Sequence, residues 1–144
     1  MYFGVDYYPE QWEPGMLDED LDRIVELGCN VIRIGEFAWH LMEPEKGKFD
    51  FSFFDRVIAA AGRRGLSVIF GTPTAAPPAW LAHRYPDVLA RWENGAPGPS
   101  AGAMWPATTA LLSGALRRMS GPGPALQEER TIVAWQIDKR AGPT

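Results

Sequence analysis

The sequence is poor in the two residue types that most often hold structural metals. It contains one cysteine, Cys29, and two histidines, His40 and His83, among 144 residues. A single cysteine cannot form a disulfide within the chain, which favours a reducing compartment. One cysteine and two separated histidines also lack the spacing of a metal site, so we expect no bound metal.

The chain also lacks a basic excess, a long apolar run and a phosphate-binding loop. Its formal net charge is −4 and its pI about 5.2, so it offers no basis for binding nucleic acid or an anionic membrane surface. We find no basic, apolar leader and no apolar stretch long enough to span a membrane. No Walker or Rossmann glycine motif follows a predicted strand. We therefore expect a cytoplasmic protein without a cofactor.

What the chain does contain is an alternation of apolar strands with amphipathic helices. Strands are predicted at residues 2–8, 30–35, 66–71 and 131–137, and helices at 17–27, 51–64, 79–85 and 107–119. Residues 36–50 are predicted to be a long irregular connection. Strand, helix and strand at this spacing form a βαβ unit and imply parallel pairing. The predicted fold class is therefore α/β, with about four parallel strands and their helices forming the first half of a (β/α)8 TIM barrel.

Four segments, in order, resemble one enzyme family. They are GVDYYPEQW at 4–12, NVIRIGEFAWHLMEPEKGKFDFSFFD at 30–55, GTPTAAPPAWLAHRYPDVL at 71–89 and IVAWQID at 132–138. Together they resemble the N-terminal part of the catalytic barrel of glycoside hydrolase family 42, the bacterial β-galactosidases. A complete barrel of this type needs roughly 250 residues. The resemblance therefore makes residues 1–144 a partial glycoside hydrolase catalytic barrel whose substrate is a galactoside.

The resemblance implies a retaining hydrolase of terminal β-D-galactosides, in which two glutamates about 5 Å apart act as acid/base and nucleophile. In the family the acid/base glutamate follows an asparagine at the end of the fourth strand. Here Lys139 stands at the asparagine position and Arg140 at the glutamate position. Arginine cannot donate and recover a proton near neutral pH. Because the resemblance also puts the nucleophile beyond residue 144, no catalytic residue is intact and we expect the chain to be inactive alone.

Five other side chains lie near the predicted strand ends and are candidates for a substrate pocket. They are Tyr7, Glu36, Trp39, Trp135 and Asp138. Carboxyl ends of parallel strands are where barrel enzymes place their functional groups.

Each candidate also has a purely structural interpretation. Glu36 could be a buried carboxylate paired with Arg33 or with a backbone donor. Tyr7 and Trp12 could pack beneath the barrel mouth instead of lining it. Asp138 lacks a partner carboxylate, which argues against a direct catalytic role.

Residues 96–130 differ in character from the rest of the chain. They are rich in glycine, proline, alanine and serine and do not match the family where the resemblance would place a substrate-binding arginine and a zinc-binding cysteine, and they contain no cysteine. We expect a divergent insert that is either read out of frame or poorly ordered. One purine inserted into the codons AAC-GAG would read Lys-Arg, as found at 139–140. A frameshift is therefore one hypothesis for both segments.

Three interpretations of function remain open at this stage. The chain is a truncated or damaged β-galactosidase, a non-catalytic sugar-binding or structural half-barrel module, or an inactive remnant. Four strands of a barrel leave two open edges, and we expect Val31, Ile34, Val68, Phe70, Val133 and Trp135 to face inward without their partners. We expect aggregation, oligomerisation or a loose state, and a family-like homo-oligomer is not favoured for a fragment.

Overall fold

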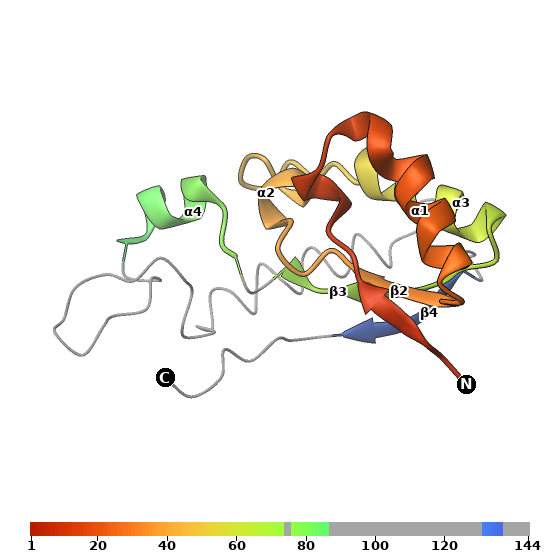
Figure 1. The fold of residues 1–144 in the computed structure, drawn as a ribbon. Coiled ribbons are helices and arrows are strands. Elements are labelled where there is room, and N and C mark those ends of the chain that lie inside the picture. The colour runs from red at the N-terminus through yellow and green to blue at the C-terminus, as the bar shows by residue number, and fades with distance from the viewer. Residues whose placement is uncertain (74–75, 87–130, 137–144) are drawn as a thin grey trace, which may run out of the picture.

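The computed structural model describes residues 1–73, 76–86 and 131–136. These residues form a four-stranded parallel sheet in the order β1-β2-β3-β4 (Figure 1). The strands are β1 (Gly4–Asp6), β2 (Val31–Ile34), β3 (Ser67–Gly71) and β4 (Ile132–Gln136). The helices are α1 (Leu17–Glu26), α2 (Trp39–Met42), α3 (Ser52–Arg63) and α4 (Ala79–Arg84). The predicted alternation of parallel strands and helices is confirmed.

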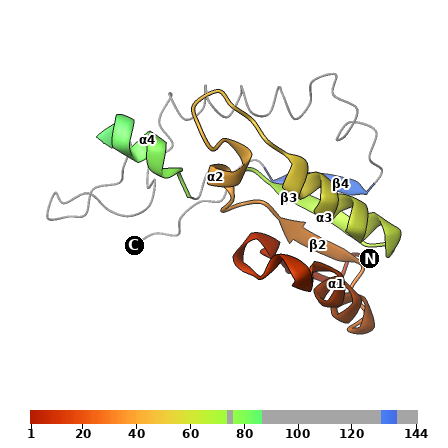
Figure 2. The ribbon, with the colours of Figure 1, turned by 90° about the horizontal axis from the view of Figure 1, so that it is seen from above.

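The two longer helices, α1 and α3, lie on the same face of the sheet (Figures 1 and 2). No described helix covers the opposite face. Consecutive strands are neighbours in the sheet, which is the arrangement expected of right-handed βαβ units. The described residues therefore form a two-layer portion of a barrel, with one sheet face packed and the other open. Among them, no helix is long and apolar enough to cross a bilayer.

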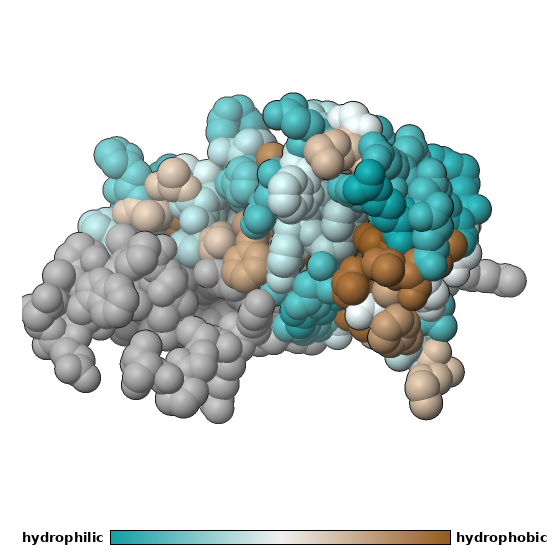
Figure 3. Space-filling view, in the orientation of Figure 1, coloured by the Kyte–Doolittle hydropathy of each residue, from teal (hydrophilic) through white to brown (hydrophobic). Residues whose placement is uncertain are grey.

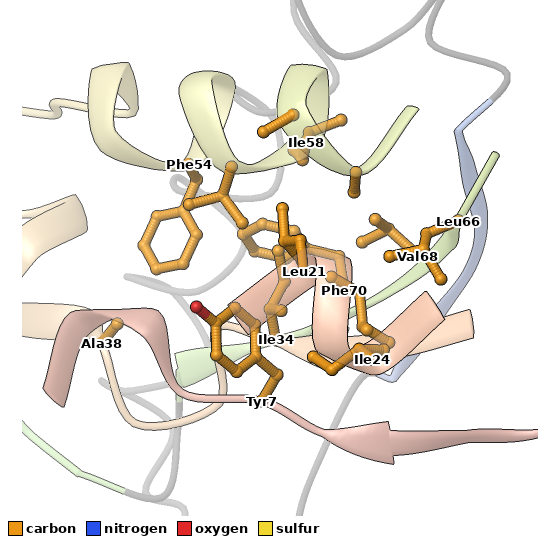
Figure 4. Packing of buried hydrophobic residues seen from close by; sticks show 14 of the residues in the cluster. Tyr7, Leu21, Ile24, Ile34, Ala38, Phe54, Ile58, Leu66, Val68 and Phe70 are labelled. Carbon is orange, nitrogen blue, oxygen red and sulfur yellow. The ribbon is translucent and has the colours of Figure 1, made fainter. Parts of the chain in front are cut away.

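The core lies between this sheet and the two helices (Figure 4). Ile32 pairs with Val68 and Ile34 with Phe70 across β2 and β3, and all four side chains are buried. Helix α1 adds Leu21 and Ile24, and α3 adds Phe54, Val57 and Ile58. Phe54 packs edge-on against Phe70, with ring centroids 5.3 Å apart. The helices form because their apolar residues recur every three or four positions and so share one face.

The prediction about inward-facing residues is wrong for part of its set. Ile34, Val68 and Phe70 belong to the core under the helices. Side chains alternate between sheet faces, so Val31 and Ile34, three positions apart, cannot face the same way. The pairing of β3 with β4 is irregular between Val68 and Ile69 of β3, and beyond that point Trp135 pairs with Phe70 on the helix side.

The connection after β2 also differs from the prediction. It contains the short helix α2, which buries Trp39 and Met42. One helical turn is too short to produce a detectable apolar period, so the sequence did not indicate it. Gly28 has φ of +81°, a value that suits glycine and explains why α1 ends there as predicted. The predicted helix at 107–119, the insert at 96–130 and residues 137–144 lie outside the described residues.

Candidate functional site

Arg33 forms the centre of a polar network at the carboxyl ends of the strands. Its Nη2 lies 2.5 Å from Oδ2 of Asp6, and its Nη1 donates to Oε1 of Gln136 over 2.7 Å. Its Nε lies 3.0 Å from Oε2 of Glu36, an ion pair without the angle of a hydrogen bond. One guanidinium therefore joins β1, β2, β4 and the segment after β2.

The strand register explains why these side chains meet. Asp6 and Arg33 are Cα partners in adjacent parallel strands, so their side chains leave the sheet on the same face. Arg33 is in register with Ile69, which is in turn in register with Ala134. Gln136, two residues after Ala134, points to that face as well. This is the face that the described helices leave uncovered, so the network lies on the open side of the sheet.

Glu36 is the most buried member of the network, with 1% of its surface exposed. Besides Arg33, the hydroxyl of Tyr8 donates to Oε1 of Glu36 over 3.1 Å. Glu36 follows Gly35, whose φ is +93° and whose missing Cβ would lie 3.0 Å from the Phe70 ring. A Cβ there would crowd the Phe70 ring at a φ that favours glycine, and this sharp turn brings the glutamate back towards the strand that carries Arg33.

Negative charge exceeds positive charge around this arginine. Burial disfavours the charged guanidinium, but the Asp6 and Glu36 carboxylates outweigh it and raise the pKa of Arg33. Burial raises the pKa of Glu10, and the nearby Glu36 charge adds to this increase. Both carboxylate oxygens of Glu10 are buried without a hydrogen-bond partner among the described residues. The site thus offers acceptors in excess and one firmly charged donor.

Of the predicted pocket residues that the structure describes, only Glu36 contacts Arg33. Tyr7 lies in the core, 7% exposed, and its hydroxyl donates to Asp20 on α1 over 3.0 Å (Figure 4). Trp39 is 2% exposed, and its Nε1 donates a hydrogen bond to Oε2 of the buried Glu43. Trp135 contacts Phe70 on the helix side, with ring centroids 5.3 Å apart.

The remaining predicted positions are partly outside the described residues. Asp138, Lys139 and Arg140 lie there, so their roles stay predictions. His40 and His83 are exposed. Glu36 is buried and ion-paired with Arg33, and its role as a pocket residue stays a prediction.

Sequence reasoning missed three members of the network, Asp6, Tyr8 and Gln136. The available signal was a polar residue within an apolar strand, as at Arg33 in VIRI and Gln136 in IVAWQ. Tyr8 also packs against Phe37, with ring centroids 5.3 Å apart, which places an aromatic pair beside Glu36.

Within the described ranges, no three histidine, cysteine or acidic side chains lie close enough together to hold a metal.

Comparison with known proteins identifies the family. The model of glycoside hydrolase family 42, described as β-galactosidase, matches residues 6–142. The chain belongs to this family. The chain is 49% identical over 86 residues to β-galactosidase BgaA of a Thermus species. The aligned region covers 60% of the chain and 13% of that relative. It is 32% identical to β-galactosidase BgaA of Clostridium cellulovorans, covering 100% of the chain and 22% of the relative.

Solved family 42 structures agree with this assignment. The β-galactosidase of Rahnella sp. R3 superposes with a TM-score of 0.83 at 30% identity, covering 100% of the chain and 22% of that structure. The β-galactosidase of Marinomonas ef1 gives a TM-score of 0.80 at 31% identity, with 99% and 22% covered. The chain thus spans between 13% and 22% of the curated relatives' length. It is an N-terminal half-barrel of the family 42 catalytic fold.

Proposed function

We propose that the chain is the N-terminal part of a retaining β-galactosidase and that the Arg33 network forms the floor of its galactoside site. The observation that carries this proposal is the bridge from Arg33 to Asp6, Glu36 and Gln136 at the carboxyl ends of three strands. Barrel enzymes assemble their active sites at this end of the sheet. The network therefore lies where a galactoside site is expected.

The described residues fit a role in positioning. Gln136, held by Arg33, stands three and four residues before the positions of the family's asparagine and acid/base glutamate. Fixing the end of β4 in this way limits the movement of whatever follows it, and small displacements of catalytic groups are costly. Acidic side chains near Arg33 can accept hydrogen bonds from sugar hydroxyls, and the Tyr8–Phe37 pair adds an aromatic surface beside them.

The proposed reaction needs two carboxylates, one as acid/base and one as nucleophile. With Arg140 at the acid/base position, we infer that the 144-residue chain does not hydrolyse galactosides by itself. The test is turnover of nitrophenyl β-galactoside by the purified chain. We expect no rate above background, and none from the double variant Lys139→Asn with Arg140→Glu, because the nucleophile is still missing.

A full-length version with the family's reading frame restored is the positive control and should hydrolyse the substrate. Saturable turnover by the unmodified chain would overturn the inferred inactivity, provided that Glu36→Gln or Asp138→Asn abolishes it. Loss of turnover in these variants rules out a contaminating enzyme.

A non-catalytic sugar-binding module is the second candidate. It is favoured by the buried Arg33–Glu36 pair in a chain that has arginine at the acid/base position. Titration of the chain with galactose separates the two candidates. Saturable binding that Glu36→Gln weakens supports the module, whereas absence of binding supports a fragment that needs the rest of its barrel.

The origin of the altered segments is a separate proposal. A frameshift accounts for both Lys139-Arg140 and the composition of residues 96–130. Resequencing the locus tests it. An uninterrupted frame, with no family-like sequence in the alternative frames, would contradict a frameshift.

A further inference from the structure

Glu10 carries a carboxyl group that the network around Arg33 does not account for. It lies in the 3-10 turn η1 (Pro9–Gln11), which follows the carboxyl end of β1. Both of its carboxylate oxygens are buried, and neither has a hydrogen-bond partner among the described residues. Buried polar groups in proteins almost always have a partner, and an ionised carboxylate without one is especially unfavourable. Burial without a partner therefore favours the protonated, neutral form of Glu10.

The residues next to Glu10 fix its turn to the candidate site. The Tyr7 amide donates to the Arg33 carbonyl over 2.9 Å, and the Tyr8 hydroxyl donates to Oε1 of Glu36 over 3.1 Å. Figure 3 shows a pale surface in the middle of the view, where the chain passes from β1 to α1, as expected of a segment rich in tyrosine, proline and tryptophan. Weakly polar surroundings of this kind disfavour an ionised carboxylate.

The charges around Glu10 also favour a bound proton. Burial is the main cause of its raised pKa, its own amide opposes the shift in part, and the Glu36 carboxylate adds to it. Glu10 acts in turn on Tyr7, whose pKa is raised mainly by burial and by its hydrogen bond to Asp20 on α1. Arg33, the cation of the network, pairs with Glu36 and with the aspartate of β1. Within the described residues, Glu10 itself has no ion pair.

We propose that Glu10 is a positioning residue of the site, which shares one proton with Glu36 and so keeps that glutamate ionised and oriented against Arg33. This inference rests on the proposed function. A protonated carboxyl group has one O–H donor, and Glu36 is the carboxylate whose charge reaches Glu10. A hydrogen bond from a neutral acid to a carboxylate is charge-assisted and therefore strong. Two carboxyl groups coupled in this way titrate as a pair, so each step belongs to both.

Loss of the shared proton should loosen the site. It would place two ionised carboxylates beside one guanidinium, and their repulsion would push the turn at 9–11 away from Glu36, together with the Tyr8 hydroxyl. The folded chain binds the proton more tightly than the unfolded chain, because folding raises the pKa of Glu10. Stability should therefore fall as pH rises from the ordinary value of about 4.5 to the raised pKa, and stay level above it.

Carbon-13 NMR titration of the glutamate carboxyl groups in the 144-residue chain tests the shared proton. The Glu10 signal should titrate at higher pH than that of Glu13, an exposed glutamate three residues further on. The Glu36 signal should shift in the same step. Glu10→Gln should remove this step from the Glu36 signal, because glutamine keeps the shape and a donor but cannot titrate. Glu13→Gln is the matched control and should leave the Glu10 and Glu36 signals unchanged.

Hydrogen exchange measures the loosening of the turn. The Gln11 and Trp12 amides donate to the Tyr8 and Pro9 carbonyls over 3.0 and 3.4 Å. Their protection, corrected for the intrinsic effect of pH on exchange, should fall at least about threefold across the Glu10 step. It should stay constant in Glu10→Gln and fall in Glu13→Gln as in the unmodified chain. Constant protection in the unmodified chain would contradict the loosening.

Two results of the titration would overturn the shared proton. The first is a Glu10 signal that titrates together with Glu13. The second is a Glu10 signal that titrates at higher pH while the Glu36 signal does not move, because burial alone would then hold the proton. Glu36→Gln keeps the test valid if Glu10→Gln does not fold. Removal of the Glu36 charge should lower the pH at which Glu10 titrates, and no change would contradict the proposal.

The titration uses no sugar, so its failure can be told apart from failure of the proposed function. A coupled titration, in a chain whose restored full-length version does not hydrolyse galactosides, supports the proton pair and counts against the proposed function. Hydrolysis by that version, with independent titration of Glu10 and Glu36, supports the proposed function and overturns the proton pair.

Discussion

Replacing Arg33 with methionine should release the end of β4 from the rest of the sheet. Arg33 reaches across β3 to Gln136, whose position in sequence is 103 residues away. Methionine keeps much of the aliphatic stem and removes the guanidinium. The backbone ladder between β3 and β4 stays intact, so the change isolates the contribution of the side-chain bridge.

The magnitude follows from the geometry of that bridge. A hydrogen bond from a charged donor contributes about 1.5–3 kcal/mol when it is shielded from water. The Arg33 side chain is 24% exposed, which places the effect at the lower end of the range. About 1.5 kcal/mol corresponds to a roughly tenfold change in the equilibrium for local opening.

Hydrogen exchange measures this opening directly, without requiring global two-state unfolding. Amides in residues 131–136 should exchange roughly tenfold faster in Arg33→Met. The Thr72 amide, which donates to the Gln136 carbonyl over 2.8 Å, should follow them. Gln136→Met should have a similar effect, and the double variant should be little worse than either single variant, because both remove the same contact.

Arg64→Met is the matched control, because Arg64 pairs with Asp18 and Asp22 on α1 and its side chain does not bridge to Gln136. It should leave exchange at residues 131–136 unchanged. The reasoning is refuted if Arg33→Met changes that exchange less than about twofold, or if Arg64→Met accelerates it equally.

Three further predictions concern the surroundings of the site. Glu43→Ala should lower stability by roughly 3 kcal/mol in urea unfolding, because it leaves a buried indole N–H and the Gly47 amide without their acceptor, and Glu43→Gln should cost less. Burial and a hydrogen bond to an aspartate raise the pKa of Tyr7, so its contribution to stability is complete below about pH 10 and falls above it. Tyr7→Phe should abolish this alkaline fall in a pH series of unfolding curves. Gly35→Ala should destabilise the chain more than Gly47→Ala, because only the first adds a contact with Phe70 to the cost of a positive φ, about 1–2 kcal/mol. Equal midpoints for the two glycine variants would contradict this.

The parallel fold could be predicted because its signals are local. The apolar period of α1 and α3, the short apolar strands and the stop at Gly28 all depend on residues within one element. The short helix α2 could not be found in this way, because burial of Trp39 and Met42 is decided by the tertiary structure.

The candidate site was only partly predictable because its contacts are long-range. Glu36 and its partner Arg33 are three residues apart, so their pairing could be proposed from the sequence. The contacts of Arg33 with Asp6 and Gln136 depend on strand register, and a shift of one residue would send these side chains to the other face. The irregular register of β4 had the same effect on Trp135, which the sequence placed in the pocket and the structure places beside Phe70.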